Sequence, residues 1–246
     1  MKKDVPKIAV VGSSNMDLVV KSNRIPAVGE TILGGDFIMV PGGKGANQAV
    51  AAAKLGAEVY FVAKLGNDVF AEQSLVNFKK ETVNTKHVIQ TDEAPSGVAL
   101  ILVDEGGNNL IVVAPGANQT LLPADVRRAE PDIASCGAVV AQLEVPLETI
   151  ECAAKMANDL KVPFVLDPAP ARELGPELLG MVDVLTPNET EAQILTGIEV
   201  TDEESARAAS ENLLERDVKA VTLTLGDKGF LLADREEARY ISAHKV

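Results

Sequence analysis

Hydrophobic runs alternate with helical patterns along most of the chain. The run at 8–11 is apolar throughout and leads into Gly-Ser-Ser-Asn, as expected of a buried strand that ends in a turn. From 44 to 55, apolar residues recur at helical spacing until Gly56, a residue type that commonly ends helices. The same patterns predict further strands at 59–63, 88–89, 138–143, 164–167, 184–185, 220–225, 230–233 and 239–241, and further helices at 70–81, 147–160, 189–195 and 205–216.

Two stretches interrupt this alternation and predict a second, smaller sheet. Residues 17–40 show rough apolar–polar alternation between Gly and Pro breaks, which is typical of short strands. The apolar stretches on either side of the Glu-Gly-Gly-Asn-Asn turn at 105–109 indicate a hairpin. We therefore expect an α/β protein of one domain, 1–246, with a doubly wound, mostly parallel sheet flanked by helices and a small sheet from about 17–41 and 97–114.

Composition and charge narrow the class of protein. Hydrophobic residues make up 46% of the 246 positions but aromatic residues only 3%, so the core must be built from aliphatic side chains, which suits a buried parallel sheet. The net charge of −13 disfavours nucleic acid and anionic membranes as partners. No apolar run approaches the ~18 residues of a membrane span. With only two cysteines and no leader pattern, we expect a cytoplasmic protein.

Asn15 and Asp17 follow the first predicted strand. In open α/β sheets, ligands bind beyond the carboxyl ends of the strands. Two residues apart in extended chain, an amide and a carboxylate face the same side and can hold vicinal hydroxyls. Asn and Asp also favour ordinary turns, so a purely structural role stays open for this pair.

A glycine-rich segment precedes the helix predicted at 44–55. Its glycines would let backbone N–H groups approach a ligand at the start of the helix. The segment has neither the spacing of a P-loop nor that of a dinucleotide fingerprint. A plain helix-entry loop is the alternative, although the three glycines at 42, 43 and 45, with Lys44 and Asn47, are more than a turn requires.

The chain resembles the ribokinase family, the phosphofructokinase-B type carbohydrate kinases, over essentially its whole length. The resemblance begins with 42–56, read as GGKGANQAVAAAKLG. It continues, in order along the chain, in 11–17 (VGSSNMD), 26–30 (PAVGE), 115–118 (PGAN), 142–144 (QLE), 167–172 (DPAPAR), 186–191 (TPNETE) and 224–229 (TLGDKG).

The resemblance implies a ribokinase-like fold in which the small sheet is a lid over the sugar. It also implies ATP-dependent phosphorylation of D-ribose to D-ribose 5-phosphate, with Mg²⁺. By position, the implied sugar-binding residues are Asn15, Asp17, Gly42, Gly43, Lys44, Asn47 and Glu144. The implied nucleotide-binding residues are Asn188, Thr224, Gly226, Asp227 and Gly229, and Glu191 would contact Mg²⁺ through water. An N-cap role for Asn188 and a plain turn at 225–229 are the structural alternatives.

The second signature of the family, D-T-x-G-A-G-D, does not occur in this sequence. The resemblance assigns its last Asp the role of catalytic base, and its glycines form the anion hole for the transferring phosphoryl group. We therefore expect no catalytic residue among these 246 positions. The catalytic Asp, the loop for the monovalent cation K⁺ and the C-terminal part of the fold are expected beyond Val246.

Two other functions stay open from the sequence. One is a non-catalytic sugar-binding or assembly module derived from such a kinase, and the other is a family kinase acting on fructose or a nucleoside. The apolar lid residues Ile111 and Val113 would contact the sugar or a partner lid, or simply pack the lid. An apolar lid face suggests a homodimer.

Overall fold

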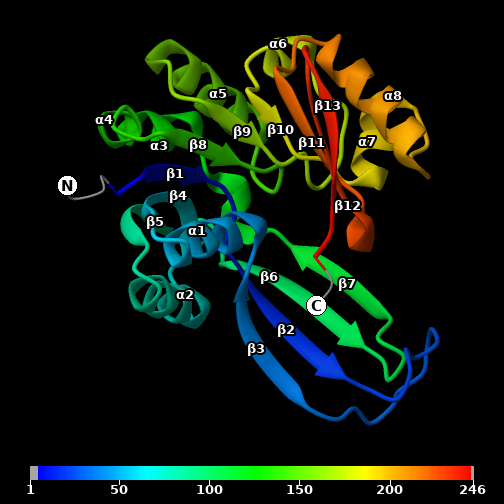
Figure 1. Ribbon diagram of the computed structural model, residues 1–246. Helices are drawn as coiled ribbons and strands as arrows, with labels where there is room; N and C mark the ends of the chain where they lie inside the picture. The colour runs from blue at the N-terminus through cyan, green and yellow to red at the C-terminus, as the bar shows by residue number, and fades with distance from the viewer. Residues whose placement is uncertain (1–4, 245–246) are drawn as a thin grey trace.

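The main sheet winds outward in both directions from β1. In the computed structural model, which describes residues 5–244, its strand order is β13-β12-β11-β10-β9-β8-β1-β4-β5 (Figure 1). All neighbours are parallel except the antiparallel β11–β12 and β12–β13 pairs. The strands are β1 (Lys7–Val11), β4 (Glu58–Gly66), β5 (Asn84–Thr91), β8 (Ala138–Ala141), β9 (Phe164–Leu166), β10 (Val184–Leu185), β11 (Ala220–Thr224), β12 (Gly229–Asp234) and β13 (Ala238–Ser242).

Helices cover both faces of the main sheet. On one face, α1 and α2 pack over β1 and β4, with Phe61 and Phe78 in edge-to-face contact at 5.3 Å between ring centroids. On the other, α3, α5, α7 and α8 enclose a larger aliphatic core. The helices are α1 (Lys44–Lys54), α2 (Val69–Lys80), α3 (Pro123–Arg128), α4 (Glu130–Ile133), α5 (Leu147–Leu160), α6 (Pro176–Leu179), α7 (Glu189–Thr196) and α8 (Glu203–Leu214), with short 3₁₀ turns η1 (Gly116–Thr120) and η2 (Gly226–Lys228).

Side chains at the helix starts explain why several helices begin where they do. Asp68 accepts a hydrogen bond from the Ala71 backbone N–H and caps α2. Asn188 and Glu191 form a reciprocal capping box at the start of α7. Helix α1 differs, because its N-cap residue, Gly43, has no side chain to satisfy the free N–H groups.

A second sheet projects from the main one (Figure 1). Its strands, in the order β3-β2-β6-β7, are β2 (Asn15–Lys21), β3 (Phe37–Gly42), β6 (Gly97–Val103) and β7 (Asn109–Ala114). The chain passes from β1 into β2 through three buried residues, 12–14, so the two sheets join directly beside the carboxyl end of β1. The expected small sheet and the hairpin between β6 and β7 are therefore present.

The fold class predicted from the sequence is confirmed, with differences in detail. The strand predicted at 88–89 is longer, because the polar residues Asn84, His87, Gln90 and Thr91 also pair with β4. The short helices α3, α4 and α6 were not predicted. Each has Pro at its first or second position, which favours a helix start, but each is too short to show a helical pattern.

Candidate sugar and nucleotide site

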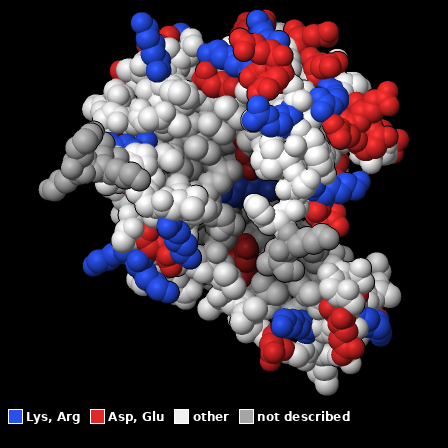
Figure 2. Space-filling model, viewed as in Figure 1, with Lys and Arg blue, Asp and Glu red and all other residues white. Residues whose placement is uncertain are grey.

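Polar residues gather where the winding of the main sheet reverses. The strands β1 and β8 are neighbours, but the chain runs outward through β4 and β5 before it returns to β8. Ser13 follows β1 and Glu144 follows β8, so both lie at this switch point, the usual ligand position in open α/β sheets. Figure 2 shows a hollow between the two sheets, with both acidic and basic side chains on its floor.

The carboxylate of Glu144 rests on the first turn of α1. Its Oε2 accepts a hydrogen bond from the Lys44 backbone N–H at 2.9 Å and another from the Ser13 hydroxyl. The Ser13 hydroxyl oxygen in turn accepts from the Gly45 N–H at 3.2 Å. Glu144 therefore supplies, from a distant strand, the negative charge and acceptor that the uncapped helix lacks.

Asp17 lies on β2 of the second sheet, close enough to Glu144 for their charges to interact. Its carboxylate packs on Gly42, where a Cβ would overlap the carboxylate oxygens. Gly43, with φ of +91°, turns the chain from β3 into α1. Burial raises the pKa of Asp17, and the nearby charge of Glu144 raises it further. Hydroxyl donors from a polyol would stabilise both carboxylates.

The other predicted sugar-binding residues differ in burial and in the groups that they contact. Asn15 is buried at the start of β2, where its Oδ1 accepts from the amide of Asn118 at 2.7 Å. Asn47 is exposed on α1. Lys44 lies close enough to Asp167 for its positive charge to lower the pKa of that carboxyl.

Asp167 was not among the predicted site residues. It follows β9, and its Oδ2 accepts a hydrogen bond from Gln48 of α1 at 3.0 Å. Burial raises the pKa of Asp167 to about 6, with the charges of Glu191 and Glu144 adding to the effect. The DPAPAR segment was the available signal, but only the fold shows that its Asp lies among charged residues from three other segments.

The predicted nucleotide residues lie along the adjacent strand ends. Asn188 forms an isolated bridge with Thr224, which ends β11. Gly226 and Asp227 are exposed in η2, whereas Gly229 is buried at the start of β12, with its backbone against β13. The two predicted sets are joined through Asp167, which interacts electrostatically with Lys44 and Glu144 on the sugar side and with Glu191 on the other.

For Mg²⁺, the carboxylates of Asp167 and Glu191 fit the kind of contact expected. The charge of Glu191 raises the pKa of Asp167, and a hydrated cation between the two carboxylates would offset that repulsion. One Glu191 oxygen is already engaged with the Asn188 N–H at 2.9 Å. Within residues 5–244, no three His, Cys, Asp or Glu side chains converge in a way that could hold a metal ion directly.

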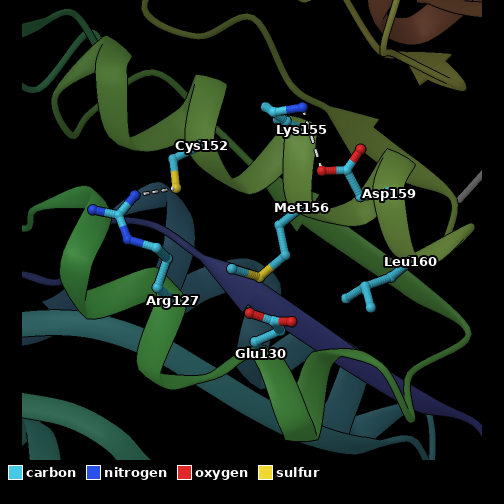
Figure 3. A pocket seen from close by; sticks show the side chains of 7 residues that line it. All are labelled: Arg127, Glu130, Cys152, Lys155, Met156, Asp159 and Leu160. Atoms are coloured by element: carbon cyan, nitrogen blue, oxygen red, sulfur yellow. Dashed lines mark hydrogen bonds and ion pairs between the residues drawn. The ribbon is translucent and has the colours of Figure 1, made fainter.

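A separate cavity of about 260 Å³ lies between α3–α4 and α5 (Figure 3). There Arg127 points at the thiol of Cys152, with 3.4 Å between Nη1 and Sγ. None of the residues around this cavity belongs to the polar cluster at the strand ends. Among the helices of residues 5–244, none is long and apolar enough to cross a membrane.

The comparison with known families is decisive. The model of the pfkB family carbohydrate kinases matches residues 5–246, which is nearly the whole chain. The chain belongs to the pfkB family of carbohydrate kinases. The match covers both sheets.

Relatives within the pfkB family are similar over most of their length. The chain is 42% identical to the ribokinase of Haemophilus influenzae, over 97% of this chain and 78% of that protein. It is 40% identical to the deoxyribokinase of Salmonella typhi, with the same coverage. The solved structure of Arabidopsis thaliana ribokinase complexed with ribose and ATP matches with a TM-score of 0.89 at 33% identity, over 97% of this chain and 78% of that one.

Proposed function

We propose that this chain binds D-ribose and ATP for transfer of the γ-phosphoryl group to the sugar, which yields D-ribose 5-phosphate and ADP. The observation that carries the proposal is the pair of carboxylates, Asp17 and Glu144, which face one hollow at the start of α1. Similarity of about 40% to ribokinases supports the choice of a pentose.

The carboxylates would bind the sugar by accepting hydrogen bonds from its hydroxyls. Glu144 is held by Lys44 and Ser13 through Oε2, so its direction is fixed before the sugar arrives. Such preorganisation reduces the entropy lost on binding. Because phosphoryl transfer depends mainly on positioning and charge stabilisation, holding the sugar rigidly is the main contribution that these residues can make.

On the nucleotide side, Asn188 and the segment 224–229 would receive ATP. Asp167 and Glu191 would hold Mg²⁺ through water, and the ion would supply positive charge to the phosphates when bound. The catalytic base would come from the second family signature, which does not occur in this sequence.

We also propose a homodimer formed through the second sheet, and a cytoplasmic location. The outer apolar residues of this sheet, such as Phe37 and Val112, are more than half exposed. Such a patch on a soluble enzyme commonly marks an interface. The free thiols of Cys136 and Cys152 fit a reducing compartment.

The test is a coupled ADP-release assay of the 246-residue chain with ribose, ATP, Mg²⁺ and K⁺, beside ribose binding by calorimetry. Binding with turnover would support the proposed reaction and would show that a group other than the absent signature Asp serves as the base. Binding without turnover would support the sugar-binding part of the proposal and leave the non-catalytic sugar-binding function as the alternative. Absence of both would overturn it.

A substitution of Glu144 tests whether this carboxylate contributes to ribose binding. Glu144→Gln should weaken ribose binding about 10-fold or more, because a charged acceptor is lost. The matched control is Glu148→Gln, four residues later and exposed in the first turn of α5, which should bind ribose like the unaltered chain. Equal affinities for both variants would contradict the role of Glu144.

A second candidate substrate is 2-deoxyribose, favoured by the 40% identity to a deoxyribokinase. A panel of ribose, 2-deoxyribose, fructose and a nucleoside in the same binding assay decides between them. Tighter binding of 2-deoxyribose than of ribose would show that no interaction with the 2-hydroxyl contributes to affinity.

A further inference from the structure

We propose that Asn118 is a positioning residue that turns the carboxamide of Asn15, so that Asn15 offers the sugar an N–H donor and not an oxygen acceptor. The inference rests on the proposed function, since it concerns how the same site binds its sugar. Asn118 lies in η1 and is 1% exposed, and Asn15 is 5% exposed. Asn118 is the last residue of the PGAN segment at 115–118, but it was not among the predicted site residues.

The orientation of Asn118 is set by a peptide backbone. Its Oδ1 accepts from the Ser14 N–H at 2.9 Å, and its Nδ2 donates to the Ser14 carbonyl at 3.2 Å. A backbone N–H can only donate and a carbonyl can only accept, so the amide of Asn118 has one satisfactory orientation. Its Nδ2 must therefore be the atom that faces Asn15.

The orientation of Asn15 follows from that of Asn118. The Nδ2 of Asn118 is 2.7 Å from Asn15 Oδ1, which consumes the acceptor of Asn15. Among residues 5–244, no group accepts a hydrogen bond from Asn15 Nδ2. The N–H groups of this amide are therefore available to donate to a ligand. The opposite strand position is Gly97, where a Cβ would overlap both Asn15 Oδ1 and Asn118 Nδ2. The absence of a side chain there makes room for the amide pair.

This donor complements the rest of the hollow. Asp17 and Glu144 can only accept hydrogen bonds when ionised, whereas a sugar hydroxyl both donates and accepts. With Asn15 as a donor, the site contains acceptors for the hydroxyl protons of the sugar and a donor to its oxygen atoms. The ligand group opposite Asn15 is thus an oxygen with a free lone pair, as in a hydroxyl or ring oxygen.

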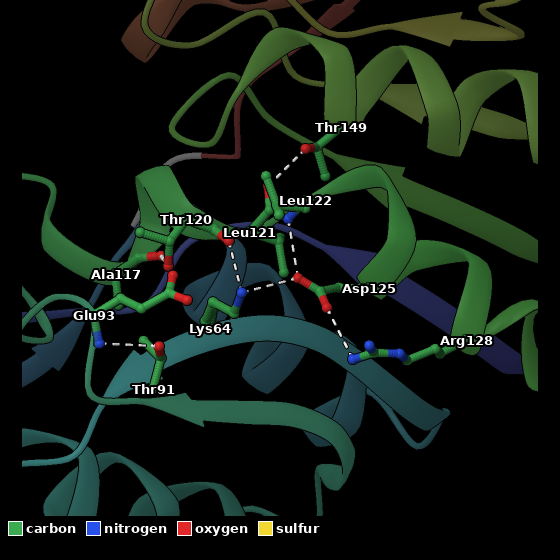
Figure 4. A network of polar contacts seen from close by, with 10 residues as sticks. All are labelled: Lys64, Thr91, Glu93, Ala117, Thr120, Leu121, Leu122, Asp125, Arg128 and Thr149. Atoms are coloured by element: carbon green, nitrogen blue, oxygen red, sulfur yellow. Dashed lines mark hydrogen bonds and ion pairs between the residues drawn. The ribbon is translucent and has the colours of Figure 1, made fainter.

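A buried ion pair holds the segment that carries Asn118. Lys64, on β4, is 8% exposed and donates to the Thr120 carbonyl at 2.7 Å (Figure 4). Its Nζ also lies 3.1 Å from Asp125, which accepts from the Leu122 N–H at 3.0 Å. These contacts fix η1 to the main sheet just after Asn118, so the amide has a rigid support.

Ribose binding by four variants tests the proposal. Asn15→Asp keeps the acceptor for Asn118 but replaces the donor with an oxygen, and should weaken binding at least about 10-fold. Asn118→Asp should weaken it similarly, because Asn15 then turns its amine toward position 118. Asn15→Ala should also weaken binding, and adding Asn118→Asp to it should change nothing further, since Asn118 acts only through Asn15.

A purely structural role of Asn118 would give a different pattern. Its substitution would then weaken binding additively with Asn15→Ala, which would overturn the proposal. Wild-type affinity in Asn15→Asp would do so too. Asn158→Asp, an exposed change on α5, is the matched control and should match the unaltered chain.

The orientation of the Asn15 carboxamide can also be determined in the absence of sugar. In a crystal structure of Asn118→Asp, the carboxamide of Asn15 should be turned over relative to the unaltered chain, and an unturned amide would contradict the inference. Failure of the unaltered chain to bind any sugar would count against the proposed function, and this readout would still decide the orientation.

Discussion

Asp167 is a carboxyl group whose pKa of about 6 lies within the range of ordinary assays. An aspartate in an unfolded chain has a pKa of about 3.9, so the folded chain binds this proton more tightly. The stabilising contribution of protonated Asp167 is fully present below about pH 4 and is lost as the pH rises through 6. Relative to Asp167→Asn, the unaltered chain should lose about 1–2 kcal/mol between pH 4 and pH 7, a value reduced for partial exposure. Urea unfolding at both pH values measures it.

The matched control for this pH effect is Asp36→Asn. Asp36 is exposed in the loop before β3, and its removal should leave the pH dependence of the unaltered chain in place. Parallel stability curves for Asp167→Asn and the unaltered chain would show that Asp167 titrates normally, and the electrostatic description of the site would then be wrong.

Some residues of the candidate site could be predicted from the sequence and others could not. Asn15, Asp17 and Glu144 could be singled out because each follows a strand or a recognisable segment. Asn118 and Asp167 also stand in recognised segments, PGAN and DPAPAR, but no site role was assigned to them, because each has a hydrogen-bond partner more than a hundred positions away. A buried amide acquires its role from the groups it faces, and the sequence does not list those neighbours.

At the scale of the elements, the packing of α3 against β4 depends on the buried ion pair between Lys64 and Asp125. Lys64→Met leaves the Asp125 carboxylate buried without its main partner and should destabilise the fold by about 3–5 kcal/mol. Arg128, at 3.1 Å from Asp125, is mostly exposed and should offset only a small part of this loss. Urea denaturation with an unchanged slope would measure the difference.

An exposed ion pair provides the comparison. Lys54→Met removes the partner of Glu81 at 3.5 Å, where the lysine side chain is 62% exposed, and should cost about 0–1 kcal/mol. If Lys64→Met and Lys54→Met were equally stable, this packing would not depend on the buried pair, and the support inferred for η1 would be lost.

The elements were predictable where burial imposes a pattern. Helix α5 was predicted at 147–160, its observed bounds, because one face is apolar over four turns. Strand β5 was recognised only at 88–89, because it lies at the edge of the sheet and six of its eight residues are polar. Short helices such as α3 depend on Pro and on tertiary contacts, and carry too few residues for a period to show.

At the scale of the whole molecule, the pairing of the second sheet assigns its two faces. Asp17 pairs with Ala99, and Ala99 with Val113, so Val113 and its alternate neighbour Ile111 lie on the face that carries Asp17. Val112 lies on the opposite face. Under the proposed function, the face with Asp17 would contact the sugar and the opposite face would contact a second copy of the sheet.

The proposed dimer can be separated from sugar binding by this alternation. Val112→Lys places a charge on the outer face and should convert a dimer of twice 25.9 kDa into a monomer, because a buried unpaired charge opposes association. Ile111→Lys, one position away on the inner face, should leave the dimer intact and weaken ribose binding. Light scattering after size-exclusion chromatography measures both masses. A monomeric unaltered chain, or dissociation by Ile111→Lys alone, would mean that the outer face is not the interface.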